Sequence, residues 1–436
     1  MHDPRSSSDI LRLHVDLHVN NSSCCCRIII VLIMSAWMTL TSAPATASDD
    51  MQLERVILLY RHGVRTPLPG EVQANEVTGK PWPTWSQTPS ELTPHGAMGA
   101  RRMGAYDHER LAAEGLFPTK ECPASSSIWF WANTDQRTIA SAKALAQGFA
   151  PGCAITIGHL RQGSDDPLFH PIEAGVVAWN AREAVASIQS QTHGPDSLTA
   201  PHRTDLAAMA SVLGCNSGDT QPICDSSTWH GSLTTSPEHD HMVLTGPIAT
   251  TSGTAEVILM AYAEGRSLSD VGWGRTDATK LEQLSRLHSL LFDIYARPSY
   301  MAERVASVMS KRIVSTLQDA GAPRLSVLVG SDNNIVALAS VLGIHFKMPG
   351  YGQDDPPIGG AFGIELWRRP ATGRRYVRVF YQAQTLSQLR SLESTNDGDK
   401  PAVLLLYPAG CLSNKEEFCP LERVIPALER AAIRAK

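Results

Sequence analysis

Three segments of the chain share one layout, in which a short apolar run is followed by a polar motif and then by a stretch typical of a helix. They are Arg55–Tyr60 with Arg61–Arg65, Ile128–Ala132 with Asn133–Arg137, and Leu325–Val329 with Gly330–Asn334. Apolar runs of this length that lack polar alternation indicate strands buried on both faces of a sheet. We therefore predict an α/β fold with a mixed central sheet flanked by helices.

Each polar motif lies between a predicted strand and a predicted helix. In open α/β sheets, ligands bind outside the carboxyl ends of the strands and close to the amino ends of helices. The repeated layout therefore predicts that one edge of the sheet collects all three motifs into a single site.

A region of different character separates the second of these segments from the third. Residues 171–297 are rich in Ala, Ser, Thr and His and include two stretches typical of helices, Gly253–Gly265 and Lys280–Arg297. We interpret this region as a smaller, mostly helical cap domain, inserted between the two parts of the α/β core, residues 48–170 and 298–436.

The second part of the core contains further strand candidates. Gly363–Arg369 and Tyr376–Gln382 flank a turn at Pro370–Gly373 and predict a β-hairpin. Pro401–Tyr407 predicts one more strand, because it is a short apolar run with a proline at its start.

Residues 1–47 have the layout of a secretory signal peptide. A polar stretch that ends at Arg27 is followed by the apolar run Ile28–Leu40 and by the small residues of Thr41–Ala47. This order is typical of an export signal that is cleaved near its end. A membrane anchor is the alternative, but about 13 apolar residues are too few to span a bilayer comfortably. We predict export, with no membrane contact after cleavage.

Cysteine usage agrees with export. The chain has nine cysteines, and removal of Cys24–Cys26 with the leader leaves six: Cys122, Cys153, Cys215, Cys224, Cys411 and Cys419. An even number in an exported chain indicates disulfides, although six cysteines alone allow 15 pairings. No CxxC pair or Cys/His spacing indicates zinc.

Composition and charge exclude some classes of protein. With 43% hydrophobic and 19% charged residues, the chain is an ordinary globular sequence. A formal net charge of −5 gives no support to nucleic-acid binding, which needs a basic face. Glu238–His241 has the composition of a metal cluster, but adjacent residues rarely converge on one ion, so we predict no metal.

Arg61–Pro67 (RHGVRTP) is the sharpest chemical motif in the chain. Arginine keeps its charge, and its planar fork matches the oxygens of a phosphate group. A neutral imidazole such as that of His62 can attack phosphorus while flanking arginines neutralise the oxygens. Gly63 is expected to let the backbone bend tightly beside the phosphate. The alternative is a surface turn with a partly buried histidine.

The motif resembles the signature of the histidine acid phosphatases, in particular the bacterial periplasmic phytases and glucose-1-phosphatases. Similar elements follow through almost the whole mature chain: Pro81–Trp85, Leu92–Gly96, Asp135–Arg137, Asp166–Phe169, Gly272–Arg275 and Leu287–His288. The resemblance implies a phosphoglycerate-mutase-like fold, a periplasmic or secreted location, an acidic optimum and no cofactor. It also implies the disulfides Cys122–Cys153, Cys215–Cys224 and Cys411–Cys419.

The roles of the family's residues carry over by position. The resemblance implies that His62 becomes phosphohistidine and that Asp332 protonates the leaving alcohol. The residues that would bind phosphate are Arg61, Arg65, Arg137 and Ser331. For Asp332 the alternative is a helix N-cap. Arg137 lies in the first turn of a helix, where the helix dipole disfavours a cation unless an anion is bound.

Two other groups of residues have lesser roles in this interpretation. Thr66 and Arg275 are further candidates for contacting the substrate, and a structural ion pair is the alternative for Arg275. The remaining histidines that we considered are interpreted as structural or supporting rather than catalytic; they are His95, His170 and His288.

Two departures from the family bear on function. Ser331 stands where relatives usually have a histidine that contacts the phosphate, and loss of one charge-assisted contact costs about 1.5–3 kcal/mol, or roughly ten- to hundredfold in turnover. Leu68 and Pro69 stand where some phytases have a threonine and a lysine that bind extra phosphates. The sequence therefore favours sugar phosphates such as glucose 1-phosphate, with phytate as a second candidate.

We therefore predict an exported acid phosphatase that hydrolyses small phosphomonoesters. The first alternative is a catalytically degenerate phosphate-binding protein of the same fold, which Ser331 suggests. The second is a phosphoglycerate-mutase-like phosphotransferase, which shares the Arg-His-Gly signature but needs neither export nor disulfides. A purely structural surface protein would leave the arginines at the strand ends unexplained.

Overall fold

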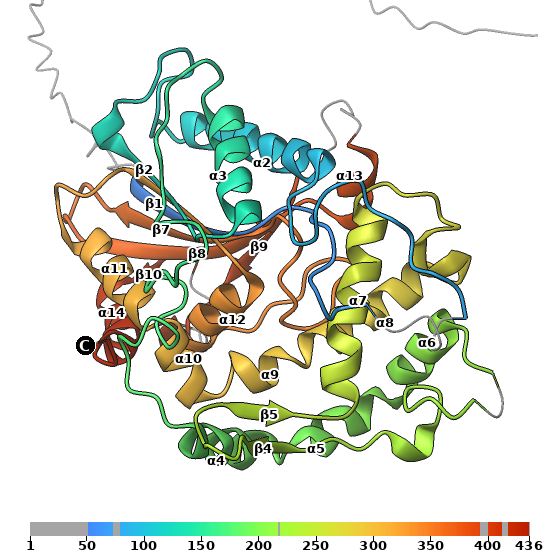
Figure 1. Cartoon of the computed structure of the whole chain (residues 1–436). Coiled ribbons are helices and arrows are strands. Elements are labelled where there is room, and N and C mark those ends of the chain that lie inside the picture. The colour runs from blue at the N-terminus through green and yellow to red at the C-terminus, as the bar shows by residue number, and fades with distance from the viewer. Residues whose placement is uncertain (1–50, 73–78, 217–218, 393–399, 412–416, 436) are drawn as a thin grey trace, which may run out of the picture. The chain divides into compact units, whose positions relative to one another are not determined.

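The three apolar runs form neighbouring parallel strands in the middle of one mixed sheet (Figure 1). The structure is a computed structural model that describes residues 51–72, 79–216, 219–392, 400–411 and 417–435. The strands are β1 (Gln52–Arg61), β6 (Leu325–Gly330) and β2 (Ile128–Ala132), and they lie in the order β1-β6-β2. The predicted signal peptide, residues 1–47 with Cys24–Cys26, lies outside the described residues. The predicted α/β fold with a mixed central sheet is confirmed.

The antiparallel part of the sheet lies on the other side of β1. The full order is β10-β8-β7-β1-β6-β2-β3, and β9 also pairs with β8. The added strands are β7 (Ala361–Arg368), β8 (Arg375–Ala383), β9 (Ala402–Leu406), β10 (Cys419–Pro420) and β3 (Ile157–Gly158). The expected hairpin is thus β7–β8, and the strand expected near Pro401 is β9.

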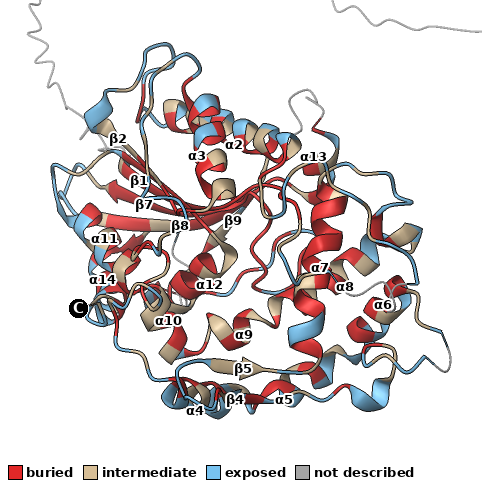
Figure 2. Ribbon diagram, viewed as in Figure 1, coloured by how far each residue is buried: buried red, intermediate tan, exposed pale blue. Residues whose placement is uncertain are grey.

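Both faces of the central strands are covered, which explains why their sequences lack polar alternation. On one face, Val56, Leu58 and Tyr60 belong to a hydrophobic cluster with α2 (Pro94–Ala113) and α3 (Gln136–Phe149). The alternate residues of β1 belong to a second cluster, which includes residues of α12 (Asp332–Val341) and α14 (Leu421–Ala432). Figure 2 shows the buried strands between these two layers of helices.

Residues 171–297 form helices and one short hairpin. Their elements are α4 (Ala181–Thr192), α5 (Pro195–Thr199), α6 (Arg203–Leu213), β4 (Leu233–Thr235), β5 (Met242–Leu244), α7 (Pro247–Ala263), α8 (Ala278–Ser289) and α9 (Phe292–Tyr295). Residues of α6, α7 and α8 share one hydrophobic cluster with the β1 face that packs on α12. The chain continues with α10 (Ser299–Val305) and α11 (Ser307–Gln318), and α13 (Leu386–Ser391) follows the hairpin.

Two helix boundaries differ from the sequence prediction. Helix α7 starts at Pro247, in the first turn where proline fits, rather than at Gly253. The β-branched Thr250 and Thr251 lower helix propensity, so the first turns of α7 were not predicted from the sequence. Helix α8 ends at Ser289, because Leu291 N donates to His288 O, a three-residue step that ends the α-helical ladder. Among the described residues, no helix is both long and apolar enough to cross a bilayer.

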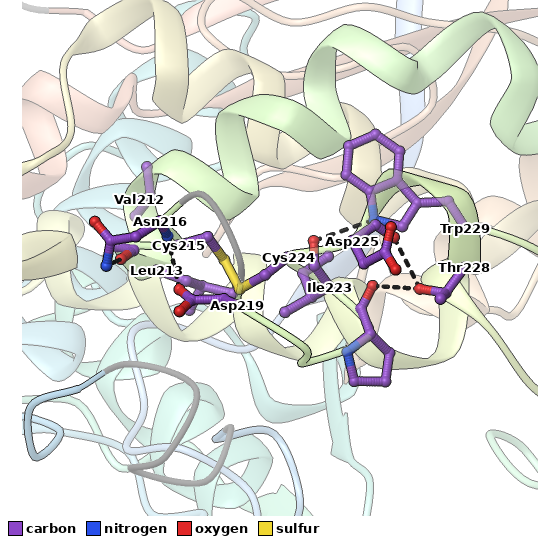
Figure 3. The surroundings of a disulfide bond; sticks show 12 residues. Val212, Leu213, Cys215, Asn216, Asp219, Ile223, Cys224, Asp225, Thr228 and Trp229 are labelled. Atoms are coloured by element: carbon purple, nitrogen blue, oxygen red, sulfur yellow. Dashed lines mark hydrogen bonds between the residues drawn. A yellow bond between two sulfur atoms is a disulfide. The ribbon is translucent and has the colours of Figure 1, made fainter.

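The structure pairs six cysteines of the described residues in three disulfides. The pairs are Cys122–Cys153, Cys215–Cys224 and Cys411–Cys419, the same pairs that the family resemblance implies. Figure 3 shows Cys215–Cys224 joining the end of α6 to the turn before Trp229. Trp229 Nε1 donates to Ile223 O at 3.1 Å, so the bridge and the buried indole hold this turn together.

Candidate active site

The three polar motifs meet where β1, β6 and β2 end side by side. Arg61 is in register with Gly330, and His62 N donates to Gly330 O at 3.2 Å. On the other side of β6, Asn133 N donates to Val329 O at 2.9 Å. The carboxyl ends of parallel strands thus bring together residues that are far apart in the sequence.

The ring of His62 is buried and held by a local hydrogen bond. Nδ1 lies 2.9 Å from Gly63 O, and because a carbonyl only accepts, Nδ1 carries the proton and Nε2 keeps its lone pair. Burial and the positive charges of Arg137, Arg65 and Arg61 hold the pKa of His62 well below its usual value. His62 is therefore a neutral imidazole with a free Nε2 even in mild acid.

Gly63 has a different role from the expected backbone bend. Its backbone is not in the left-handed region, and a Cβ at this position would lie 2.8 Å from Gly96 O. Gly96 is tighter still, because its Cβ would lie 2.2 Å from Val64 O. The two glycines let the signature loop pack directly against the start of α2. Gly63 N also donates to Ser141 Oγ at 3.0 Å, which ties the loop to α3.

The three candidate phosphate arginines are each held by a carboxylate. Arg65 forms two hydrogen bonds of 2.7 Å with the two carboxylate oxygens of Glu71, and Arg137 Nη2 lies 2.9 Å from Asp135 Oδ2. Within the described part of the chain, the buried Nε atoms of Arg61, Arg65 and Arg137 have no hydrogen-bond partner. The same holds for the Nε atoms of Arg110, Arg266 and Arg312, so what distinguishes these three arginines is that their positive charges act together on His62. Such a cluster of positive charge suits an anion such as phosphate.

Asp332 occupies the first position of α12 and faces Arg61. Its Oδ2 lies 3.0 Å from Arg61 Nη2, and its Oδ1 accepts a hydrogen bond of 2.8 Å from Asn333 N. Burial alone would raise the carboxyl pKa, but the positive charges of Arg61 and His288 outweigh it and lower the pKa of Asp332 to about 2. In the free protein Asp332 is therefore ionised.

Ser331, not Asp332, is the N-cap of α12. Ser331 N and Ser331 Oγ both donate to Asn334 Oδ1 at 3.0 Å. The one proton of the hydroxyl is thus used within the helix turn. Ser331 lies beside the strand ends with the other candidate residues, but its side chain caps the start of α12.

A buried network of charged side chains holds Arg61 in place. Glu256 on α7 accepts a hydrogen bond from Arg61 Nη2, and its other oxygen lies 3.6 Å from His288 Nε2. His288 Nδ1 lies 2.9 Å from Asp355 Oδ1, and Ser285 Oγ donates to the same carboxylate. Burial lowers the pKa of His288, but Asp355 and Glu256 outweigh this effect and raise it to about 9. Protonated His288 therefore neutralises the carboxylate that holds Arg61.

The sequence interpretation missed Glu256 and Asp355. Glu256 is 1% exposed and lies between the buried Ala255 and Val257 on a helix that is buried on nearly all sides. A carboxylate in such a helix is almost never fully buried unless it is paired, and that was the available signal. Its partner Arg61 is 195 residues away in the sequence, so no spacing rule connects the two.

Replacing Glu256 by glutamine is expected to destabilise the fold by about 3–5 kcal/mol, because Arg61 then keeps its buried charge with one carboxylate fewer. The free energy of unfolding in urea measures this loss. Glu422→Gln is the matched control, because Glu422 pairs with Arg374 on the surface and such pairs contribute less than about 1 kcal/mol. Equal losses in the two variants would contradict a structural role for Glu256.

The two further candidates for contacting the substrate, Thr66 and Arg275, donate hydrogen bonds to backbone carbonyl oxygens. Thr66 Oγ1 donates to Thr88 O at 2.7 Å. Arg275 contacts the end of α6, where its Nε donates to Val212 O at 2.7 Å and its Nη2 to Leu213 O at 3.0 Å.

Among the other histidines, His95 Nε2 lies 2.6 Å from Leu389 O, and His170 Nε2 lies 3.0 Å from Asn133 Nδ2. The described residues contain no group of three His, Cys, Asp or Glu side chains placed to hold a metal ion. In Glu238–His241, His241 Nδ1 is paired with Asp240 Oδ1 on the surface at 2.6 Å.

The fold and the cluster of a buried histidine with three arginines at the strand ends define a histidine phosphatase. A profile of the histidine phosphatase superfamily (branch 2) matches residues 52–223. Phytase AppA of Escherichia coli (strain K12) is 30% identical over 419 residues, which cover 91% of this chain and 96% of that protein. The chain therefore belongs to the histidine phosphatase superfamily (branch 2), and within it to the histidine acid phosphatase hydrolases.

Further relatives carry two different names. Glucose-1-phosphatase of Salmonella typhimurium is 28% identical and covers 89% of this chain and 94% of its own length. The solved structure of Hafnia alvei phytase in complex with tartrate superposes with a TM-score of 0.79 at 29% identity, covering 89% of this chain and 98% of that one. The phytase and glucose-1-phosphatase relatives have similar sequence identities to this chain, so these identities do not indicate which substrate it prefers.

Proposed function

We propose that this protein is an exported acid phosphatase that hydrolyses phosphomonoesters through a phosphohistidine intermediate on His62. Sugar phosphates such as glucose 1-phosphate are the proposed substrates, with phytate as a second candidate. One observation carries the proposal: the neutral ring of His62 keeps an unprotonated Nε2 beside the positive charges of Arg61, Arg65 and Arg137. Such donors stabilise the charge that develops on a transferring phosphoryl group.

In the first step, His62 Nε2 attacks phosphorus and the bond from phosphorus to the alcohol oxygen breaks. Arg61, Arg65 and Arg137 neutralise the phosphoryl oxygens, while Asp332 gives a proton to the leaving alcohol. In the second step, water attacks phosphohistidine as the carboxylate of Asp332 takes a proton from it. Inorganic phosphate leaves and His62 returns to its neutral form.

The proton on Asp332 must arrive with the substrate. The pKa of Asp332 is about 2 in the free protein, so the carboxyl group is ionised at any working pH. A phosphomonoester monoanion carries a proton up to its second pKa of about 6. Its negative charge also offsets the arginines that hold the pKa of Asp332 down. We therefore propose that the monoanion delivers the proton to Asp332 and that the enzyme for this reason has an acidic pH optimum.

The domain roles belong to the same proposal. Residues 1–47 act as a signal peptide, and the mature enzyme works in the periplasm or outside the cell. The three disulfides support this location. Residues 171–297 serve as a cap that selects the substrate, while residues 48–170 and 298–436 form the phosphatase core.

A degenerate phosphate-binding protein is the second candidate. The observation in its favour is that the hydroxyl of Ser331 donates to Asn334 and offers no proton to a phosphate. Such a protein would bind phosphate or tungstate without turnover, because its arginines remain in place.

The test is phosphate release from p-nitrophenyl phosphate by the mature chain, from residue 48, with EDTA present. We expect turnover at pH 4–6 that survives EDTA. With glucose 1-phosphate, whose leaving alkoxide needs a proton, we also expect turnover to decline above pH 6, because the monoanion disappears there while His62, with its lowered pKa, stays neutral. Tungstate binding without turnover in folded, disulfide-bonded protein would replace the hydrolase by the degenerate binder.

A further inference from the structure

The turn from Asp166 to His170 is fastened to β2. The carboxylate of Asp166 is buried, and its Oδ2 accepts a hydrogen bond of 2.8 Å from Trp131 Nε1 on that strand. Its Oδ1 accepts from Leu168 N at 2.9 Å, and its backbone carbonyl accepts from His170 N at 2.7 Å. One buried aspartate therefore fixes the turn and its last residue, His170, relative to β2.

The same turn also contacts the end of β6 and the start of α12. Phe169 O accepts a hydrogen bond of 2.8 Å from Asn334 Nδ2, on the first turn of α12. The ring of Phe169 packs against Gly330, where a Cβ would lie 2.8 Å from Phe169 Cδ1. The turn therefore reaches two of the three polar motifs at the strand ends.

The ring of His170 contacts Asn133, the first residue of the motif that follows β2. Asn133 Nδ2 lies 3.0 Å from His170 Nε2 and 3.2 Å from Asp135 Oδ2. A carboxylate only accepts hydrogen bonds, so the amide nitrogen, and not the amide oxygen, faces Asp135. Because that nitrogen only donates, His170 Nε2 must accept. The contact thus needs a neutral His170 ring, with its proton on Nδ1.

The two contacts of Nδ2 fix the orientation of the Asn133 amide. Asn133 is 2% exposed, and its Oδ1 has no hydrogen-bond partner within the described residues. Loss of the His170 acceptor would leave one hydrogen of a buried amide unpaired, which is costly. The amide would then be free to turn away from Asp135.

Asp135 passes this contact on to a candidate phosphate arginine. Its Oδ2 also accepts from Arg137 Nη2 at 2.9 Å. The Asp135 side chain is 38% exposed, so without Asn133 it could turn with Arg137 toward water. After burial, the charge of Arg137 is the strongest influence that lowers the pKa of His62, ahead of Arg65 and Arg61. The orientation of Arg137 therefore matters at the nucleophile.

We propose that His170 is a positioning residue for phosphate binding, which holds the Asn133 amide and thereby fixes Asp135 and Arg137. This inference rests on the proposed function, because that function assigns Arg137 to the phosphate. An arginine that is already oriented loses less side-chain freedom when the anion binds. Such a contact acts on the ground state and the transition state alike, so its loss is expected to raise KM and leave kcat nearly unchanged.

The test compares His170→Ala with His170→Gln in the mature chain. Neither variant carries a charge at this position, but only glutamine offers an oxygen that can accept from Asn133. Calorimetry with inorganic phosphate at pH 7.5, where a histidine side chain is ordinarily neutral, should show about fivefold weaker binding by His170→Ala. His170→Gln should bind within about twofold of wild type. At pH 5 the two variants should differ by the same factor, and KM for glucose 1-phosphate should follow it.

Two controls separate positioning from a general loss of structure. In an Asn133→Ala background, the two His170 variants should bind phosphate equally, because the donor is gone. His241→Ala, at an exposed histidine paired with Asp240, should bind like wild type. Urea unfolding checks that each variant is folded.

Equal phosphate affinities of His170→Ala and His170→Gln would overturn the positioning role, and so would a difference that persists without Asn133. Turnover that continues in that case would leave the proposed phosphatase intact. Absence of turnover in wild type, together with the expected difference in phosphate binding, would count against the proposed function and support the role of His170.

Discussion

Replacing His62 by alanine is expected to lower kcat by at least about 10⁴-fold, because the variant lacks the ring nitrogen that forms the covalent bond to phosphorus. The ring of His62 presents an unprotonated nitrogen beside the three arginines, since its Nδ1 donates to Gly63 O. Initial rates with p-nitrophenyl phosphate at pH 5 measure the loss. Rapid acid-free quenching with labelled substrate should trap phosphohistidine on the wild-type chain and none on the variant.

His241→Ala is the control for the first prediction, because His241 is an exposed histidine outside the site and should leave kcat unchanged. A His62→Ala variant that keeps turnover within tenfold of wild type would exclude the covalent mechanism. A folded variant is also expected to bind tungstate, because the carboxylates that hold the arginines are untouched.

The second large effect is expected for Asp332→Asn, which removes the general acid. With glucose 1-phosphate, kcat should fall by about 10²–10⁴-fold, because an alkoxide is a poor leaving group without a proton. With p-nitrophenyl phosphate the loss of kcat should be much smaller, because nitrophenolate leaves unprotonated. The ratio of the two losses is the measurement, and it separates proton transfer from a general loss of structure.

Asp332 also contacts Arg61 at 3.0 Å, so a positioning role is the competing explanation. Equal losses with both substrates would assign Asp332 to the positioning of Arg61 and remove it from proton transfer. Asp165→Asn, at an exposed position outside the site, serves as the matched control and should change neither rate.

Much of the fold and the reactive motif could be predicted from the sequence because their signals are local. The non-alternating runs of β1, β2 and β6 are apolar since helices cover both faces of the sheet. Arg61, His62 and Arg65 lie within five consecutive residues at the end of β1, so their spacing alone carries the chemistry. The rule that parallel strands present their carboxyl ends at one edge was enough to bring residues near 61, 133 and 331 together.

The tertiary structure was needed to identify contacts between residues that are remote in the sequence. Glu256 and Asp355 hold Arg61 and His288 in a buried network across 195 and 67 residues, and no local pattern encodes such pairs. Gly63 serves close packing against Gly96 rather than a bend. The edge-on packing of Trp273 against Trp82 likewise depends on three-dimensional neighbours. The strands, the reactive motif and its chemistry follow from local patterns in the sequence. The charges that support the motif could be identified only in the folded chain, because burial and pairing exist only after distant segments have packed.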